Sequence, residues 1–496
     1  MSDSMINSAD GSALADAPPP TPEVIPPLRH YLGLMAGMVL LVELNAAVLQ
    51  MAVPALRSMA PHFPVAGLPW VLTVVTLVGA MLQPLGGKLA DRIGLRPMIL
   101  TVAIVFALGS LICAVTSAFA VLLIGRALQA VVLVMPAVAY RVYRDSLPAR
   151  HVPIALGTLG TGIGVAGLIG PITAGALIDN FGYRALFWFF LVYVVLVTPM
   201  VYFNLPKSVE RTVHRIDIAG GLLLSLGVGG LLLGVSEGHG WGWSSPRTVG
   251  SIVLGLILLG LFPLYERRQQ HPLLDLSLLR RPGVSMTLLV ACFGVIPGVV
   301  FGYAVPQMLQ TPTTPGLGYA FGLTALAVGL AQIPYGLCAM ILGPVGGALS
   351  RKIPVRTVMV AGLACQGLGL FLLALFHTSL PVIIVWMAIT GAGAGLFWAA
   401  LPNLVVEAVP AVHTGISGGI QLAVQATAAS MVGALIGTIL ANNVIGVTHG
   451  EPLFTNSAFV TIYLVGVASS ALGIVVTLMM RHGRRPATGG VASAAA

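Results

Sequence analysis

The chain has 496 residues, of which 57% are apolar and only 8% are charged. This balance lies far from that of soluble domains, so we predict an all-α integral membrane protein that crosses the bilayer many times. The formal net charge of +9 on its own would suggest nucleic acid, but the basic residues lie between apolar segments, and no nucleic-acid partner is expected. The four cysteines are widely separated, without the spacing of a metal site or a disulfide framework.

Fourteen apolar segments follow one another, each of a length suited to a membrane-spanning helix, which needs roughly 20 residues. We expect spans near residues 31–56, 68–85, 98–115, 119–138, 153–178, 185–203, 218–235, 249–264, 284–308, 321–342, 355–376, 382–406, 415–440 and 459–480. Residues 1–30, rich in Ala, Pro and acids, and residues 481–496, basic and then Gly/Ala-rich, are expected to be disordered cytoplasmic tails.

The positions of the basic residues test this count. With the N-terminus in the cytoplasm, 20 of the 24 Lys and Arg fall in cytoplasmic segments. Segments on the outer side of the membrane contain three of the others, Arg57, Arg184 and Arg247, and Arg126 lies within a span. Cytoplasmic loops carry such an excess of Lys and Arg. We therefore expect both termini in the cytoplasm, in a multi-pass protein of the cell (inner) membrane.

The first span contains Glu43, the only acid that these boundaries place deep within a segment. Burial away from counter-charges favours the neutral form of a carboxyl group, so such a residue can exchange protons. We interpret Glu43 as proton-coupling; a hydrogen-bonded structural acid is the alternative. Gln50 and Met51 follow it in the same span.

The turn between the second and third spans reads GKLADRIGLRP, residues 87–97. Gly94 supplies the backbone freedom of a tight turn, and an ordinary positive-inside loop is one interpretation. However, the string G-x-L-A-D-R-x-G-x-R closely resembles the signature loop of the major facilitator superfamily. The resemblance implies a conformational role for Gly87, Asp91, Arg92, Gly94 and Arg96, and we also consider Asp91 a candidate for proton coupling.

A degenerate second copy of this turn spans residues 347–356, and it matches the first at Gly87, Leu89, Ile93 and Arg96. A duplicated turn is typical of transporters built from two pseudo-symmetric bundles. Chance similarity between two membrane turns is the alternative.

The fourth span places Arg126 well inside the hydrocarbon, at a cost of about 2.5–3.5 kcal/mol on insertion scales. Its side chain should therefore face the bundle interior and bond a partner. The pattern L-x-x-x-R-x-x-Q, which ends at Gln129, is similar to the superfamily's fourth-span motif, which is implicated in proton transfer. A buried structural ion pair is the alternative.

The fifth span is rich in glycine and contains Gly170, Pro171 and Gly175. Small residues let helices approach closely, and Pro171 removes a backbone hydrogen bond, so plain helix packing explains part of the pattern. The arrangement G-x-x-G-P-x-x-x-G resembles the motif of the superfamily's antiporters, in contrast to its uptake symporters.

These matches together resemble the fourteen-span drug:proton antiporter branch of the major facilitator superfamily. The resemblance implies a major facilitator fold with two six-helix bundles plus two extra spans. We assign residues 31–204 to the N-terminal bundle, 205–283 to a linker with the two extra spans, and 284–480 to the C-terminal bundle.

A pocket between the bundles would bind a small amphipathic substrate, because apolar walls with few charges suit such compounds. Candidate lining residues, each of which could instead serve helix packing, are Gln50, Met51, Gln129, Gln307, Phe397, Trp398, Gln421 and Gln425. We expect proton-coupled export of drug-like or toxic compounds, without a metal or cofactor, by a monomer in the lipid bilayer. Export of one endogenous metabolite is the alternative in the same class. A polytopic membrane enzyme is the alternative from another class, but no catalytic cluster supports it.

Overall fold

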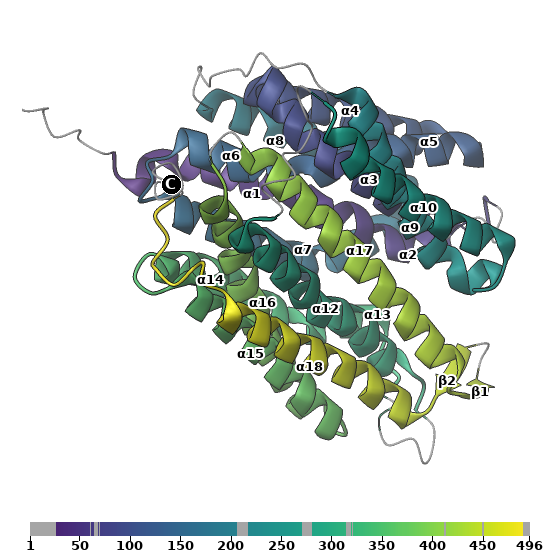
Figure 1. Ribbon diagram of the computed structural model, residues 1–496. Coiled ribbons are helices and arrows are strands. Elements are labelled where there is room, and N and C mark those ends of the chain that lie inside the picture. Colours follow the sequence, from purple (N-terminus) through teal and green to yellow (C-terminus); the bar gives the residue numbers. More distant parts are fainter. Residues whose placement is uncertain are drawn as a thin grey trace, which may run out of the picture.

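The computed structural model describes residues 26–59, 61–63, 68, 70–205, 217–269, 280–313, 319, 321–410, 413–448 and 451–489. Long helices dominate these residues and run side by side through the molecule (Figure 1). Helices satisfy every backbone polar group internally, which is what an apolar chain needs in lipid.

The first bundle and a helical hairpin come from the N-terminal half. The bundle begins with a short 3-10 helix, Leu28–Tyr31, and a second one, η3 (Ala130–Val134), connects α5 to α6. Its α-helices are α1 (Leu32–Gln50), α2 (Ala52–Met59), α3 (Trp70–Ile93), α4 (Leu95–Val115), α5 (Phe119–Gln129), α6 (Met135–Ser146), α7 (Val152–Phe181) and α8 (Arg184–Asn204). The hairpin consists of α9 (Ile218–Trp241) and α10 (Pro246–Glu266).

The second bundle follows the hairpin. Its helices are α12 (Pro282–Gln310), α13 (Ala325–Ala331), α14 (Ile333–Ser350), α15 (Val355–Leu375), α16 (Leu380–Ala408), α17 (Thr414–Ala441) and α18 (Asn456–Met479). A two-stranded antiparallel sheet, β1 (Val444–Thr448) with β2 (Glu451–Phe454), interrupts the otherwise helical chain between α17 and α18.

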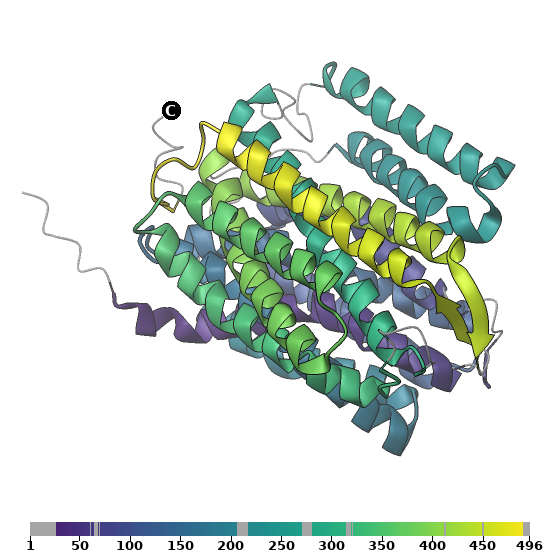
Figure 2. The ribbon, with the colours of Figure 1, turned by 90° about the horizontal axis from the view of Figure 1, so that it is seen from below.

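Each bundle has its own apolar core, one built mainly from α1, α4, α6 and α8 and the others within the second bundle. Several helix pairs join the bundles, and the most extensive are α3 with α17 and α7 with α14. The hairpin packs through α9 against both α3 and α17. It therefore covers one of the two seams between the bundles, and Figure 2 shows its two teal helices beside α17.

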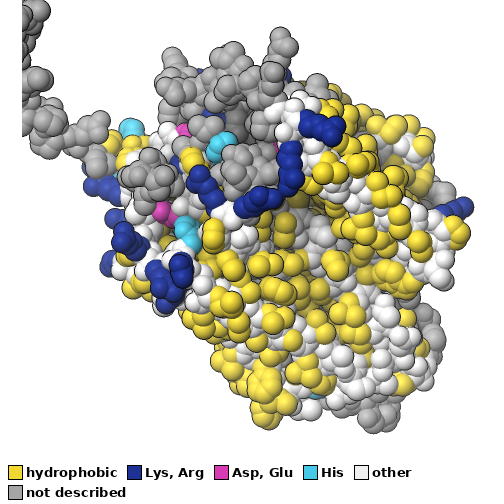
Figure 3. All heavy atoms as spheres, in the orientation of Figure 1, with side chains coloured by type: hydrophobic (Ala, Val, Ile, Leu, Met, Phe, Trp, Pro, Cys, Tyr) yellow, Lys and Arg dark blue, Asp and Glu magenta, His cyan; other side chains and the backbone are white. Residues whose placement is uncertain are grey.

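The helices have two ends, which we name by what lies there. The tail end holds the start of α1, the α3–α4 turn, the α14–α15 turn and residues 480–489, whereas the far end holds β1 and β2. Figure 3 shows most of the visible Lys and Arg side chains gathered at the tail end, at the left, and an apolar surface along the helices. The predicted alternation of charge thus corresponds to two distinct ends of the molecule.

Among the described residues, twelve helices are long and apolar enough to cross a membrane. The two other expected spans fall on α3 and α7, which have 24 and 30 residues but are not among the twelve. The all-helical, multi-pass architecture is confirmed, while the count of fourteen spans stays a prediction.

Several predicted boundaries need correction. The first span divides at Met51 into α1 and α2, and the tenth divides at Gln332 into α13 and α14. The fourth span continues to Ser146, so Arg141 and Arg144 are helical and not part of a loop. The charged turn is also helical up to Ile93, and only Gly94 separates α3 from α4.

The C-terminal tail is a further correction, because residues 481–489 are not disordered. Gly483 accepts a hydrogen bond from the backbone N–H of Arg356 at 3.1 Å, and the N–H of Ala487 donates to Ser350 at 2.7 Å. Thr488 donates through its N–H and its hydroxyl to Glu407. These backbone and side-chain bonds hold the segment against the tail end of the second bundle.

Candidate functional site

The core of the first bundle contains a buried polar network around Arg126, whose side chain is fully buried. Its Nε donates to the carbonyl of Val71 at 2.9 Å, and its Nη2 donates to the carbonyl of Val48 at 3.0 Å. Its Nη1 donates to Gln129 Oε1 at 2.7 Å. The guanidinium therefore joins α5 to α1 and α3 through neutral acceptors, and not through the ion pair that the sequence left open.

Gln129 extends this network to α4. Its Nε2 donates to Ser110 Oγ at 2.8 Å, and that hydroxyl donates to the carbonyl of Phe106. The close approach of α4 to α5 depends on Gly109 and Gly125, since a Cβ at Gly109 would lie 2.6 Å from the carbonyl oxygen of Gly125. Buried polar groups of this kind must be fully satisfied to be tolerated. The network thus fixes the relative positions of α1, α3, α4 and α5.

Glu43 lies on α1 beside α7 and α8, and it is half-buried. Its Cβ is 3.6 Å from the position that a Cβ at Gly162 of α7 would occupy. Tyr193 of α8 lies near enough for an electrostatic interaction with Glu43, and its hydroxyl donates to the carbonyl of Leu40 at 3.1 Å. The carboxyl group is therefore placed where three helices of the first bundle meet, apart from the hydrogen bonds of Arg126.

The bundles are joined at the tail end by side chains that cross between them. Arg144 Nη1 of α6 donates to the carbonyls of Val406 and Val409 at 3.1 and 2.8 Å and to Thr414 Oγ1 at 2.6 Å. Asn403 Nδ2 of α16 donates to the carbonyl of Pro153 at 3.3 Å. These contacts hold the two bundles together at the tail end.

A close helix contact strengthens this closure. A Cβ at Gly157 of α7 would lie 2.7 Å from both the carbonyl oxygen of Gly343 and the Cα of Gly347 on α14. No larger side chain fits there without displacing backbone, which is why small residues occur in this part of both helices. Gly347 also opens the second copy of the duplicated turn.

Two of the predicted substrate residues lie exposed on far-end halves of helices. Gln50 is exposed at the end of α1, and Gln307 is exposed near the end of α12. These helices belong to different bundles and share no packed interface among the described residues. Both amides are thus on the surface of the structure and make no contact that buries them.

Three other predicted substrate residues are buried inside a bundle, which corrects the expectation that they line a pocket. Met51 is 2% exposed and lies at the junction of α1 and α2, near Gly170. Gln129 is fully buried in the Arg126 network, and Phe397 is 1% exposed and packs against Gly294. Helix packing, the alternative stated from the sequence, explains these three.

The remaining predicted substrate residues lie where the bundles meet. Tyr140 of α6 donates its hydroxyl proton to Gln421 Oε1 at 3.1 Å, and Gln421 Nε2 donates to Gln425 Oε1. Trp398 of α16 is half-buried, and its Cβ lies 3.1 Å from the position of a Cβ at Gly160. These residues are part of the crossing contacts in this arrangement.

The predicted conformational motif is placed only in part. Gly94 has φ 89° and ψ 161°, Arg92 is exposed, and Arg96 is half-buried at the start of α4. Gly170 is buried and Gly175 is open, with nothing near its Cα that a Cβ would meet. The side chains of Lys88, Asp91 and Pro171 lie outside the described part of the chain, as does any contact of Gly87.

Sequence reasoning missed two residues of this arrangement. Arg144 was counted among loop charges, and Tyr140 was assigned no role, although both cross to the second bundle. The only available signal was that basic residues three positions apart, Arg141 and Arg144, lie on one face if the fourth span continues as a helix.

Comparisons with known proteins agree with this architecture. The family model described as Major Facilitator Superfamily matches residues 35–310 and 298–496. Among solved structures, the human organic anion transporter MFSD10 superposes with a TM-score of 0.63 at 15% identity, covering 90% of this chain and 100% of that one. The proton:xylose symporter XylE gives a TM-score of 0.62 at 14% identity, covering 93% and 98%. At these identities the solved structures show the fold alone.

Curated relatives are more similar in sequence. The multidrug resistance protein Stp of Mycobacterium tuberculosis is 29% identical over 81% of this chain and 74% of its own length. The tetracenomycin C resistance and export protein of Streptomyces glaucescens is 24% identical over 82% and 74%. The multidrug export protein EmrB of Escherichia coli is 30% identical over 58% and 56%.

Proposed function

The chain belongs to the Major Facilitator Superfamily, and we propose that it is a proton-coupled antiporter that exports amphipathic, drug-like or toxic compounds. Membership in this family, with transporters as relatives, makes the protein a multi-pass membrane transporter and not an enzyme. The names of the relatives, two multidrug proteins and one protein of tetracenomycin C resistance and export, support export as the direction of transport.

The observation that carries the proposal is a set of contacts that hold the two bundles together at the tail end. Arg144, Asn403 and the Gly157–Gly347 contact form this closure, while Gln50 and Gln307 are exposed on the far-end halves of α1 and α12. A transporter that alternates access must be able to open either half around one site. The positive-inside rule assigns the tail end to the cytoplasm, so this arrangement would be closed toward the cytoplasm.

Coupling to protons rests on Glu43. Its carboxyl group sits at the junction of α1, α7 and α8, and α7 also carries the glycines that pack against the second bundle. Protonation would alter the interaction of Glu43 with its neighbours on α7, and so link proton binding to the movement of that helix. Asp91 remains a second proton-carrying candidate, while Arg126 would act by holding α1 and α3 in place.

The remaining features of the proposal follow from this mechanism. The proton gradient is the energy source, and no metal or cofactor takes part. The chain would act as a monomer in the cell (inner) membrane with both termini in the cytoplasm. Export of one endogenous metabolite is the second candidate function, since Gln50 and Gln307 could recognise a polar metabolite as well as a drug.

The test measures transport of a panel of dyes and candidate metabolites in proteoliposomes with an imposed pH gradient. Wild-type protein should accumulate amphipathic dyes only when the gradient is present. Glu43→Gln should abolish gradient-driven accumulation while it retains downhill exchange. Glu237→Gln, which removes an acid from α9 instead, should keep gradient-driven transport. Continued response of Glu43→Gln to the gradient would move the proton carrier elsewhere.

A further inference from the structure

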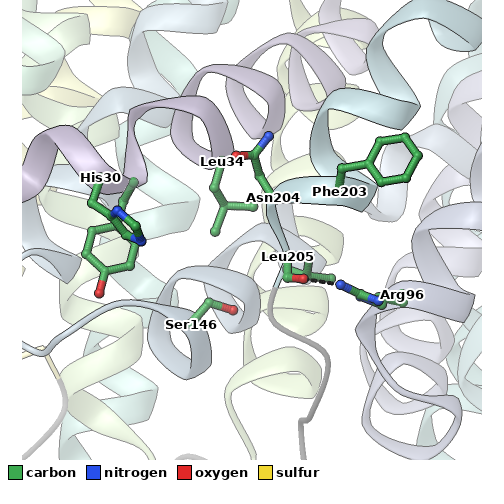
Figure 4. Close-up of a pocket in the computed structure, with 8 residues that line it drawn as sticks. His30, Leu34, Arg96, Ser146, Phe203, Asn204 and Leu205 are labelled. Atoms are coloured by element: carbon green, nitrogen blue, oxygen red, sulfur yellow. Dashed lines mark hydrogen bonds between the residues drawn. The ribbon is translucent and has the colours of Figure 1, made fainter. Parts of the chain in front are cut away.

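A cavity of about 430 Å³ lies at the tail end of the first bundle (Figure 4). The start of α1, the start of α4, the end of α6 and the end of α8 surround it. Its lining residues are His30, Tyr31, Leu34, Arg96, Ser146, Phe203, Asn204 and Leu205. Arg96 belongs to the predicted conformational motif, but the transport cycle proposed above gives the cavity itself no role.

Arg96 is the one purely donating side chain of the lining, and two polar atoms of the lining lack partners. Arg96 Nε and Ser146 Oγ are buried and have no hydrogen-bond partner. A buried donor that is left unsatisfied costs about 1–3 kcal/mol. None of the eight lining residues is an Asp or Glu. The cavity therefore combines a fixed positive charge with unused donors, which is the chemistry that binds an anion.

Arg96 is held in position from one side. Its Nη2 donates to the carbonyl of Leu205 just after α8 ends, and its guanidinium lies 5.1 Å from the centre of the Tyr202 ring. Figure 4 shows the guanidinium directed at Leu205, with the Ser146 hydroxyl on the opposite wall. A guanidinium fixed in this way binds a phosphate without losing further side-chain freedom.

The position of the cavity indicates which anion would reach it. Phe203 lines the cavity and is 79% exposed. It lies near the end of α8, which the charge pattern places at the cytoplasmic face of the membrane. Aromatic rings are favoured at the level of lipid headgroups. An anionic group that enters here can keep an acyl chain against Phe203 and the surrounding apolar surface.

We propose that this cavity binds a phosphate-bearing anionic group, supplied by the headgroup of an anionic phospholipid of the cytoplasmic leaflet. The phosphate oxygens accept from the Arg96 guanidinium and from the Ser146 hydroxyl once these side chains turn toward the cavity, while the glycerol and acyl part of the lipid passes Phe203. Bound lipid contacts α1, α4, α6 and α8 together. Anionic lipid thereby stabilises the first bundle at its tail end.

The second bundle provides a matched control for this proposal. Arg356 is the counterpart of Arg96 in the duplicated turn. There the chain's own segment lies against the turn, because Arg356 N–H donates to Gly483 and Val355 N–H donates to the carbonyl of Arg485. Loss of the Arg356 charge should therefore leave lipid binding at the cavity intact.

The experiment uses the purified full chain in mixed micelles of detergent and phosphatidylcholine. It measures the thermal midpoint of the protein as phosphatidylglycerol is added. Phosphatidylglycerol should raise the midpoint in a saturable way, whereas added phosphatidylcholine should not. Arg96→Gln and Ser146→Val should each weaken phosphatidylglycerol binding, the former about tenfold or more. Arg356→Gln should bind as the wild type does.

Two outcomes would overturn the proposal. An equal loss in Arg356→Gln would show that lipid responds to overall charge and not to this cavity. A midpoint raised equally by inorganic phosphate in phosphatidylcholine would make a free anion the ligand and exclude the lipid as its source. Midpoints of both cavity variants in phosphatidylcholine alone, compared with the wild type, show whether either variant is misfolded. Ser146→Val keeps Arg96, so it tests the cavity even if Arg96→Gln fails to fold.

Discussion

The two bundles differ in what their matching spans bury. Arg126 is the eighth residue of α5, and Met387 is the eighth residue of α16. Both side chains are fully buried, but Arg126 donates three hydrogen bonds while Met387 belongs to an apolar cluster. The first bundle thus contains a polar network at a depth where the second has ordinary core packing.

The duplicated turns differ in the same direction. In the first copy Gly94 adopts φ 89°, and a cavity with unused donors lies beside Arg96. In the second copy Pro354 has φ −53°, and the C-terminal segment lies against Arg356. Pseudo-symmetry therefore accounts for the arrangement of the helices, whereas the buried polar network and the cavity with unpaired polar atoms occur in the first bundle.

The largest expected effect comes from making the two cores alike. Arg126→Met removes three hydrogen bonds and leaves Gln129 Oε1 and the carbonyl of Val48 without their donor, at about 1–3 kcal/mol for each. We expect a large fall in the thermal midpoint in detergent and loss of transport. Met387→Leu keeps volume and polarity and should cost less than about 1.5 kcal/mol. Similar midpoints for both variants would contradict the difference between the cores.

A smaller effect is expected at the turns. Gly94 occupies a backbone region that is essentially restricted to glycine, so Gly94→Ala should cost about 1–3 kcal/mol. Pro354→Ala needs no such region and should change the midpoint little. The measurement compares the thermal midpoints of these two variants, and transport assays are made on the folded fraction of each. Equal tolerance of both substitutions would show that the first turn rearranges freely.

The crossing contacts of Arg144 should affect conformation more than stability. Arg144→Gln weakens hydrogen bonds from a charged group to the second bundle, each worth about 1.5–3 kcal/mol. The variant should open more often at the tail end, seen as faster labelling of a cysteine in place of Ile154, a larger residue of α7 that lies beside Gly347 of α14. The control is Arg351→Gln, which removes an exposed charge from the other bundle. Its introduced cysteine should be labelled at the same rate as in the protein that carries the cysteine alone. No increase for Arg144→Gln would mean that helix packing alone keeps the tail end closed.

The smallest effects concern the two exposed amides. Gln50→Ala and Gln307→Ala each remove one hydrogen-bonding group, worth about 0.5–1.5 kcal/mol, so the KM for a transported dye should rise about two- to tenfold. A rise for only one of them would assign substrate recognition to a single bundle. No rise for either would place the substrate site away from the far-end halves of α1 and α12.

The sequence by itself determined the helical, multi-pass architecture, the order of the helices and the end at which the charges gather. These features follow from local properties, since a long apolar segment in lipid must be helical and its flanking charges are written in the chain. The buried position of Arg126 was also predictable, because a charge inside a span has to face the bundle interior.

Only the tertiary structure decided which side chains meet. Gln129 and Gln50 are both glutamines within predicted spans, yet one is buried beside Arg126 and the other is exposed. The hydrophobic pattern of the spans does not distinguish these two glutamines. Helices that are apolar all round carry no polar stripe that would mark the face between the bundles. The contacts of Arg144 with α16 and α17, and the cavity beside Arg96, likewise depend on residues more than 100 positions apart in the chain.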